Sequence, residues 1–296
     1  MPKLLVENLS KSYVQKGQRL PVLDGISFAA EPGAFVAIVG PSGCGKSTLM
    51  DIICGLQPAD AGVVTVDGRP VTGPGHVAYM PQEDLLFPWR RLIDNVIVPL
   101  QLKGMPRHAA REQARRWLPF FGLDGFADAY PSQLSGGMRQ RAALLRTFLT
   151  ERDIIALDEP FGALDAHTRR RMQAWLADVH RQMGRTVLMI THDVEEALVL
   201  ADRVVVLGPR PARVVYTTDV DLPRPRDILS TAFAAYKGAV LAHLGFGNLD
   251  GPALATSADP VEDPIEHPMP HPPEHPRVRL VAPPPQPAAP GGPRGH

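Results

Sequence analysis

Nine consecutive residues near the N-terminus have the spacing G-x-x-x-x-G-K-[ST], which is typical of a phosphate-binding loop. Its residues are Gly40, Pro41, Ser42, Gly43, Cys44, Gly45, Lys46, Ser47 and Thr48. The apolar run 35–39 precedes the loop and the run 49–53 follows it, which predicts a strand, a glycine loop and a helix. Backbone N–H groups of such a loop and helix N-terminus bind phosphate oxygens. Lys46 would add positive charge and Ser47 a hydroxyl for Mg²⁺, so we expect a nucleoside triphosphate here.

A second glycine segment also precedes a predicted helix. Ser135 would cap that helix, Gly136 and Gly137 would form its first turn, and apolar or small residues recur at helical spacing up to residue 149. A bare helix N-terminus is another anion site. One nucleotide does not need two such sites from one chain in the same place. We infer that this segment serves a nucleotide held by another copy of the chain.

Two acidic residues follow an apolar run that reads as a buried parallel strand, 154–157. Asp158 would hold Mg²⁺, and Glu159 would orient or deprotonate the attacking water. A solvated loop edge is the alternative, but the run ends in Pro160 rather than in a polar loop. His192 also follows an apolar strand, and loops after the strands of a nucleotide-binding sheet carry ligand-binding residues.

Six segments, taken in order, resemble the motifs of ATP-binding cassette (ABC) ATPases, and the resemblance covers roughly residues 3–245. Residues 134–141 resemble the signature motif, and residues 154–159 resemble the Walker B strand. The D-loop is matched by residues 161–165, which end in Asp165.

The resemblance also assigns three single residues. Gln82 resembles the Q-loop glutamine, which implies a Mg²⁺ ligand that also senses a membrane partner. His192 resembles the switch histidine, which contacts the γ-phosphate, and Tyr13 falls where the family stacks an aromatic ring on adenine. The alternative for Tyr13 is a strand tyrosine packed on its neighbours. Asp193 and Glu196 have the spacing of a capping box and are expected to be structural.

Strands that alternate with helices from 150 to 207 predict a parallel sheet. The resemblance implies an α/β P-loop NTPase with a parallel-sheet core, an N-terminal antiparallel β subdomain and an inserted helical subdomain. The ABC ATPase domain would span residues 1–249, with the helical subdomain at about 90–149. Expected elements are strands near 3–9, 25–30, 63–66 and 76–80, a loop at 15–19, and helices over 92–102, 106–121 and 168–183.

Composition limits the class of protein. The 296 residues include 31 basic and 31 acidic residues, so no global charge favours nucleic acid. No apolar run approaches the roughly 20 residues that cross a bilayer. Cys44 and Cys54 lie too far apart along a helix for a disulfide, which fits reduced thiols in the cytosol. The Pro- and His-rich segment 250–296 is expected to be disordered, and ATPase activity should survive its removal.

The resemblance implies that two cassettes form a homodimer around ATP and Mg²⁺ and drive integral membrane permease subunits. A solute-binding protein outside the membrane would act indirectly, and the chain would lie on the cytoplasmic face of the membrane. Residues 85–90, 94–96, 160–165 and 208–213 resemble importers of nitrate, aliphatic sulfonates and taurine. The same pattern occurs in importers of pyrimidine thiamine precursors. Rival functions are an ABC protein of translation or DNA repair, a P-loop kinase or GTPase, and an exporter ATPase.

Overall fold

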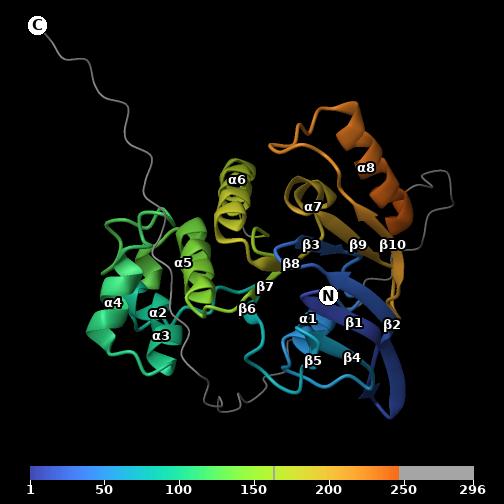
Figure 1. The fold of residues 1–296 in the computed structure, drawn as a ribbon, viewed down its shortest axis with the longest axis horizontal. Coiled ribbons are helices and arrows are strands. Elements are labelled where there is room, and N and C mark those ends of the chain that lie inside the picture. The colour runs from blue at the N-terminus through green and yellow to red at the C-terminus, as the bar shows by residue number, and fades with distance from the viewer. Residues whose placement is uncertain (163, 247–296) are drawn as a thin grey trace, which may run out of the picture.

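A six-stranded sheet lies at the centre of the computed structural model, which describes residues 1–162 and 164–246. The strand order is β10-β9-β3-β8-β7-β6, and all neighbours are parallel except β10 and β9 (Figure 1). Its strands are β3 (Phe35–Val39), β6 (Ala78–Met80), β7 (Ile154–Asp158), β8 (Thr186–Thr191), β9 (Arg203–Leu207) and β10 (Val214–Asp219). The predicted parallel core is confirmed.

A second, antiparallel sheet has the order β2-β1-β4-β5. Its strands are β1 (Leu4–Gln15), β2 (Gln18–Ala30), β4 (Ala61–Val66) and β5 (Arg69–Pro70). The first two strands extend much further than the pattern predicted. The expected loop at 15–19 is a two-residue turn at Lys16 and Gly17, both of which have positive φ. Backbone pairing through polar, exposed residues lengthens this hairpin, and polar residues give little strand signal.

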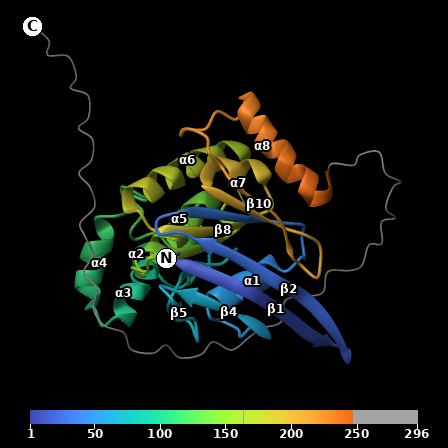
Figure 2. The same cartoon turned by 45° about the vertical axis from the view of Figure 1, so that its right-hand side comes forward.

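The helices fall into two groups: a helical group beside the β6 edge of the central sheet (Figure 1), and helices that cover the two faces of that sheet (Figures 1 and 2). The helical group consists of α2 (Leu92–Val96), α3 (Val98–Leu102), α4 (Arg107–Arg115), the 3₁₀ turn η1 (Pro131–Gln133) and the longer signature helix α5 (Gly136–Phe148), which α2 and α3 contact. The others are α1 (Lys46–Ile53), α6 (Ala166–Met183), α7 (Val194–Leu200), α8 (Thr231–Leu241) and the π-helical segment η2 (Ala242–Phe246).

Both faces of the central sheet are buried. Along β3, Phe35, Ala37 and Val39 pack with the helices, whereas Val36 and Ile38 pack with α1 and the antiparallel sheet. Both faces are therefore apolar, which explains why these strands are continuous apolar runs without alternation. The sheet is held rigidly between its two layers, and its carboxyl ends can position chemical groups.

Prolines shorten two of the predicted helices. The helix expected over 92–102 is two short helices, because Pro99 has no N–H and stands in the first turn of the second one. The helix expected over 106–121 ends at Arg115, four residues before Pro119, whose ring would clash with the Arg115 carbonyl. The proposed tail, 250–296, lies outside the described residues.

Candidate active site

The phosphate-loop segment, residues 40–48, connects the carboxyl end of β3 to the first turn of α1. Gly45 caps the helix with a φ of 113°, and an added Cβ there would lie 2.7 Å from Val22, so only glycine fits. Lys46 is buried and its Nζ donates to the carbonyl oxygens of Gly40 (2.8 Å) and Pro41 (3.0 Å). The loop therefore curls around its own ammonium group, beside the bare N–H groups of α1.

The two acidic residues at the end of β7 lie in different environments. Asp158 is buried, and its carboxylate accepts hydrogen bonds from the hydroxyls of Ser47 and Tyr79, the latter at 3.4 Å. Burial, with repulsion from Glu159, raises the pKa of Asp158, and the two hydroxyls offset only part of this rise. Because the buried negative charge of Asp158 is poorly solvated, a cation placed beside this carboxylate would stabilise its ionised form.

Glu159 is held between two other predicted residues. Its carboxylate lies 3.2 Å from His192 Nδ1 and accepts a 3.4 Å hydrogen bond from Gln82 Nε2. Glu159 has a φ of 44°, an unusual conformation for a residue other than glycine. Its N–H donates to the Ile190 carbonyl of β8 at 2.9 Å, which fixes this turn to the neighbouring strand. The structure thus brings Gln82, Glu159 and His192 together at the carboxyl ends of adjacent strands.

The signature residues lie on a different part of the molecule. Ser135 caps α5 by accepting from the Met138 N–H at 3.3 Å, as predicted, and Gly136 and Gly137 form the first turn. Within the residues described, no hydrogen bond joins this helix start to the phosphate loop. Asp165, the predicted D-loop residue, caps α6 through the N–H groups of His167 and Thr168.

Tyr13 and the predicted capping pair, Asp193 and Glu196, have mainly structural contacts. The Tyr13 hydroxyl donates to Gln57 Oε1 at 2.7 Å, and its ring remains 39% exposed on the antiparallel sheet. Asp193 caps α7 as expected. The reciprocal half of the capping box is wrong: the Asp193 N–H donates to Thr191, and the buried Glu196 carboxylate accepts from Thr191 and Gln173 instead.

Two arginines that the sequence reasoning missed join the signature helix to the segment after Gln82. Arg146 donates to the backbone carbonyls of Asp84 (2.6 Å) and Leu85 (2.7 Å). Arg139 Nε lies 3.0 Å from the Asp84 carboxylate. The two arginines are seven residues apart, two helical turns, and this spacing on one face was the available signal. Leu85 is held with a φ of 45°, so the turn is both strained and clamped.

Asn95 fixes the other end of the same segment. This fully buried side chain accepts from the Phe87 N–H at 2.7 Å. It donates to the carbonyls of Phe87, Arg90 and Arg91 at 3.1, 3.1 and 3.3 Å. A buried amide with this many backbone partners positions the loop rather than α2 alone.

The loop presents two aromatic rings near the protein surface. Trp89 is 71% exposed and its ring centroid lies 5.5 Å from that of the half-buried Phe87. Trp89 therefore does not pack inside the helical group.

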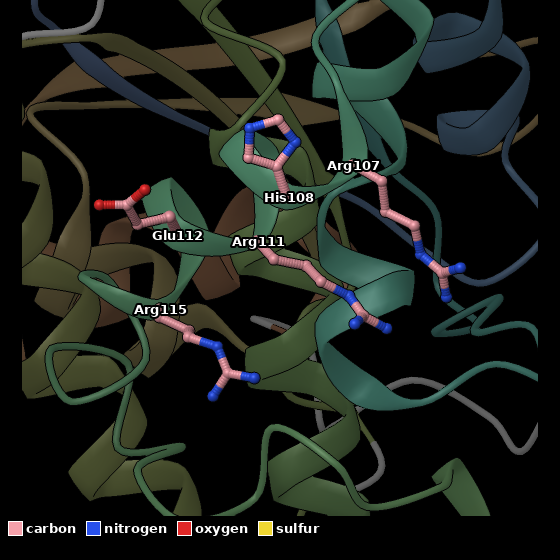
Figure 3. A pocket seen from close by; sticks show the side chains of 5 residues that line it. All are labelled: Arg107, His108, Arg111, Glu112 and Arg115. Carbon is pink, nitrogen blue, oxygen red and sulfur yellow. The ribbon is translucent and has the colours of Figure 1, made fainter.

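A shallow hollow of about 510 Å³ lies on α4 and contains none of the predicted site residues (Figure 3). Two of its lining arginines, Arg107 and Arg111, extend in the same direction from α4 and chelate Asp94 of α2. Burial opposes ionisation of Asp94, but these hydrogen bonds outweigh it and lower its pKa to about 2. The hollow is thus the outer side of a structural ion cluster.

The part of the chain that the structure describes contains no group of three or more His, Cys, Asp or Glu side chains that could hold a metal ion. Within residues 1–162 and 164–246, no helix is long and apolar enough to cross a membrane. Cys44 and Cys54 are buried free thiols. Ser47, Asp158 and Gln82 nevertheless offer the oxygen ligands that Mg²⁺ prefers.

The fold and the phosphate loop define an ATP-binding cassette. A solved dimeric cassette, MJ0796 in a post-hydrolysis state bound to ADP and Pi, is 28% identical and covers 73% of this chain and 98% of its own, with a TM-score of 0.66. A second structure of dimeric MJ0796, described as a bacterial ABC transporter cassette, has a TM-score of 0.67, 29% identity and the same coverage.

Sequence relatives extend over most of the chain. Residues 23–162 match the family described as ABC transporter. An uncharacterized ABC transporter ATP-binding protein of Methanocaldococcus jannaschii is 45% identical over 81% of this chain and 90% of its own length. The taurine import ATP-binding protein TauB of Pseudomonas aeruginosa is 44% identical (76% and 86% covered). The aliphatic sulfonates import protein SsuB of Bacillus cereus is 37% identical (82% and 96%). The chain therefore belongs to the ABC transporter family, as an ATP-hydrolysing ATP-binding subunit.

Proposed function

We propose that this chain is the ATPase of an importer for a small sulfonate such as taurine, with a pyrimidine thiamine precursor as the alternative solute. The observation that carries the proposal is its similarity, over at least 76% of the chain, to proteins named for taurine and sulfonate import. No residue of the chain is expected to contact the solute, so the solute must be identified through the partners.

The proposed catalytic centre uses the strand-end residues described above. Lys46 and the loop N–H groups bind the phosphates, and Ser47, Asp158 and Gln82 are the residues that would hold Mg²⁺ with them. Bound Mg²⁺ would neutralise charge on the phosphate oxygens. Glu159 orients the attacking water and accepts its proton, while His192, 3.2 Å away, keeps the carboxylate in place.

The second half of the site is proposed to come from another copy of the chain. Within the described residues, no hydrogen bond joins the helix start at Ser135, Gly136 and Gly137 to the phosphate loop of its own chain, and the solved neighbours are described as dimers. Two chains packed head to tail would place this helix start on the nucleotide of the partner. Stacking of the adenine on Tyr13 fits the exposed part of its ring.

Dimerisation is tested with two variants. Glu159→Gln should bind ATP, form a stable dimer with ATP–Mg²⁺ and hydrolyse at least about 100-fold more slowly, because the general base is lost. Lys46→Ala should neither bind ATP nor dimerise. Light scattering after size exclusion measures the oligomeric state of both variants. A strictly monomeric Glu159→Gln protein with ATP–Mg²⁺ contradicts the shared site.

Permease subunits in the membrane are the proposed partners, which places the chain on the cytoplasmic face as a peripheral protein. Phe87 and Trp89 form the proposed docking patch, next to the segment that reaches Gln82. Changing both residues to serine should abolish co-purification with the permease while leaving the basal ATPase rate of the isolated chain within about twofold. Leu102, also 71% exposed, provides the matched control: Leu102→Ser should still co-purify. Normal assembly of the double variant contradicts the docking patch.

The solute is identified with the reconstituted complex. Taurine, an aliphatic sulfonate, nitrate and a pyrimidine thiamine precursor are each added with the solute-binding protein, and ATPase stimulation is measured. Stimulation by taurine or a sulfonate supports the proposal. Stimulation by the pyrimidine alone overturns it.

A further inference from the structure

The turn between β9 and β10, residues 208–213, is fastened to β2. The Asp24 N–H donates to the Ala212 carbonyl at 2.9 Å, and the Ala212 N–H donates to the Val22 carbonyl at 2.8 Å. Arg213 Nε adds an ion pair with the Asp24 carboxylate at 2.9 Å. Ala212 itself is fully buried. This turn therefore moves with β2.

The same part of β2 lies against the phosphate loop. A Cβ added at Gly45 would lie 2.7 Å from Val22 Cγ1 and 3.1 Å from Leu23 Cδ2, so the backbone of the loop lies directly on these side chains. From the turn, Arg210 reaches across and its Nη2 donates to the Gly43 carbonyl at 2.7 Å. Two segments more than 160 residues apart in the sequence thus hold the loop from one side.

Fixing the Gly43 carbonyl also fixes the next N–H. In a planar trans peptide the C=O and the following N–H point in opposite directions. Arg210 binds the carbonyl, so the Cys44 N–H points the other way, toward the Pro41 carbonyl at 3.3 Å. Lys46 Nζ donates to the same Pro41 oxygen at 3.0 Å. The Cys44 N–H and the Lys46 ammonium therefore converge on one point inside the loop.

A glycine-rich loop needs such support because its backbone is otherwise free. Gly43 has a φ of 72° and a Cβ there would meet nothing within 4 Å, so its own packing does not restrain the peptide. Ordering that peptide only when the ligand arrives would cost binding free energy.

We infer that Arg210 is a positioning residue for nucleotide binding: it holds the Gly43–Cys44 peptide so that the loop is already arranged for the phosphates of a nucleoside di- or triphosphate. This inference rests on the proposed assignment of the loop as the nucleotide site. Arg210 acts through the loop backbone, and its charge also favours the approach of an anion.

The test compares Arg210→Ala, Arg210→Lys and the neighbouring Arg213→Ala in the full chain. Binding of ADP–Mg²⁺ and ATP–Mg²⁺ is measured by calorimetry, and KM and kcat are measured separately. Arg210→Ala should weaken both dissociation constants about 3- to 10-fold, as expected for one solvent-exposed charge-assisted hydrogen bond, with kcat within about twofold. Arg210→Lys should recover part of the affinity. Arg213→Ala should bind as the wild type, since the backbone bonds still hold the turn.

The outcomes separate this inference from the proposed site. If Arg210→Ala binds ADP–Mg²⁺ and ATP–Mg²⁺ as tightly as the wild type while Lys46→Ala does not bind them, the proposed role of Arg210 is overturned and the proposed nucleotide site is not affected. Equal loss in Arg210→Ala and Arg213→Ala also overturns it, because the effect then belongs to the turn. Nucleotide binding that is unchanged in Lys46→Ala overturns the site itself. The inference is supported if added KCl weakens wild-type ADP binding more than that of Arg210→Ala.

Discussion

Replacing Asn95 should show how much its hydrogen bonds to the loop before α2 contribute to the unfolding free energy of the chain. The side chain is fully buried, accepts one backbone hydrogen bond and donates its two N–H groups to three backbone carbonyls, two of which share one N–H. Each hydrogen bond is worth about 1 kcal/mol net, and a buried polar group left unpaired costs about 1–3 kcal/mol. Some of the freed groups will reach water, so Asn95→Ala should lose about 3 kcal/mol of unfolding free energy.

Urea unfolding at a fixed nucleotide concentration provides the assay, because bound nucleotide stabilises the folded state by itself. The matched control is Gln133→Ala, which removes an exposed amide of the same helical group with a single bond to the Tyr130 N–H at 2.8 Å. That variant should lose less than about 1 kcal/mol. If Asn95→Ala is no less stable than Gln133→Ala, Asn95 does not hold the loop and the reasoning from its contacts is wrong.

Two further predictions concern the same region. Because Arg111 and Arg107 lower the pKa of Asp94 to about 2, below its unfolded value near 3.8, the ion cluster stabilises the fold fully at neutral pH and ceases to do so as the pH falls toward 2. Asp94→Asn should therefore lower the free energy of unfolding by about 1–2 kcal/mol at pH 7, after allowance for the exposed part of Arg107, and by progressively less below pH 4. A difference in unfolding free energy between variant and wild type that does not change with pH contradicts this. Arg146→Met should free the strained turn at Leu85. The variant should lower kcat about tenfold, while the dissociation constant of ADP stays within twofold. Weaker ADP binding with an unchanged kcat would show instead that Arg146 acts on the nucleotide.

The sequence predicts most accurately where local pattern and chemistry agree. Uninterrupted apolar runs identify β3, β7 and β8, because both faces of these strands are buried, and the polar residues that follow each run then fall at one edge of the sheet. That rule places Glu159 and His192 at the same edge of the sheet, and their contact at 3.2 Å depends in addition on the pairing of β7 with β8, which only the structure shows. The sequence pattern also predicted the caps at Ser135 and Asp193.

Contacts made by long side chains across the fold could not be predicted in this way. The guanidinium groups of Arg146 and Arg210 bind backbone carbonyls, and a carbonyl is present at every residue, so nothing in the sequence marks the partner. The contact of Asn95 with the Phe87 backbone, eight residues away, is likewise set by the path of a loop. Such contacts depend on tertiary geometry that a local pattern does not contain.

These contacts divide the site into two supported parts. The phosphate loop is fastened to β2 and to the turn that carries Arg210, all within one packed layer. The segment that begins at Gln82 is fastened instead to the helical group, by Arg146 on α5 and Asn95 on α2. Gln82 itself reaches across to Glu159 with a single 3.4 Å hydrogen bond. That bond is long and single, whereas Asp84, Leu85 and Phe87 are each held by short bonds to the helical group. We therefore expect a rotation of the helical group relative to the sheet to change the distance between Gln82 and Glu159 more readily than it breaks these clamps.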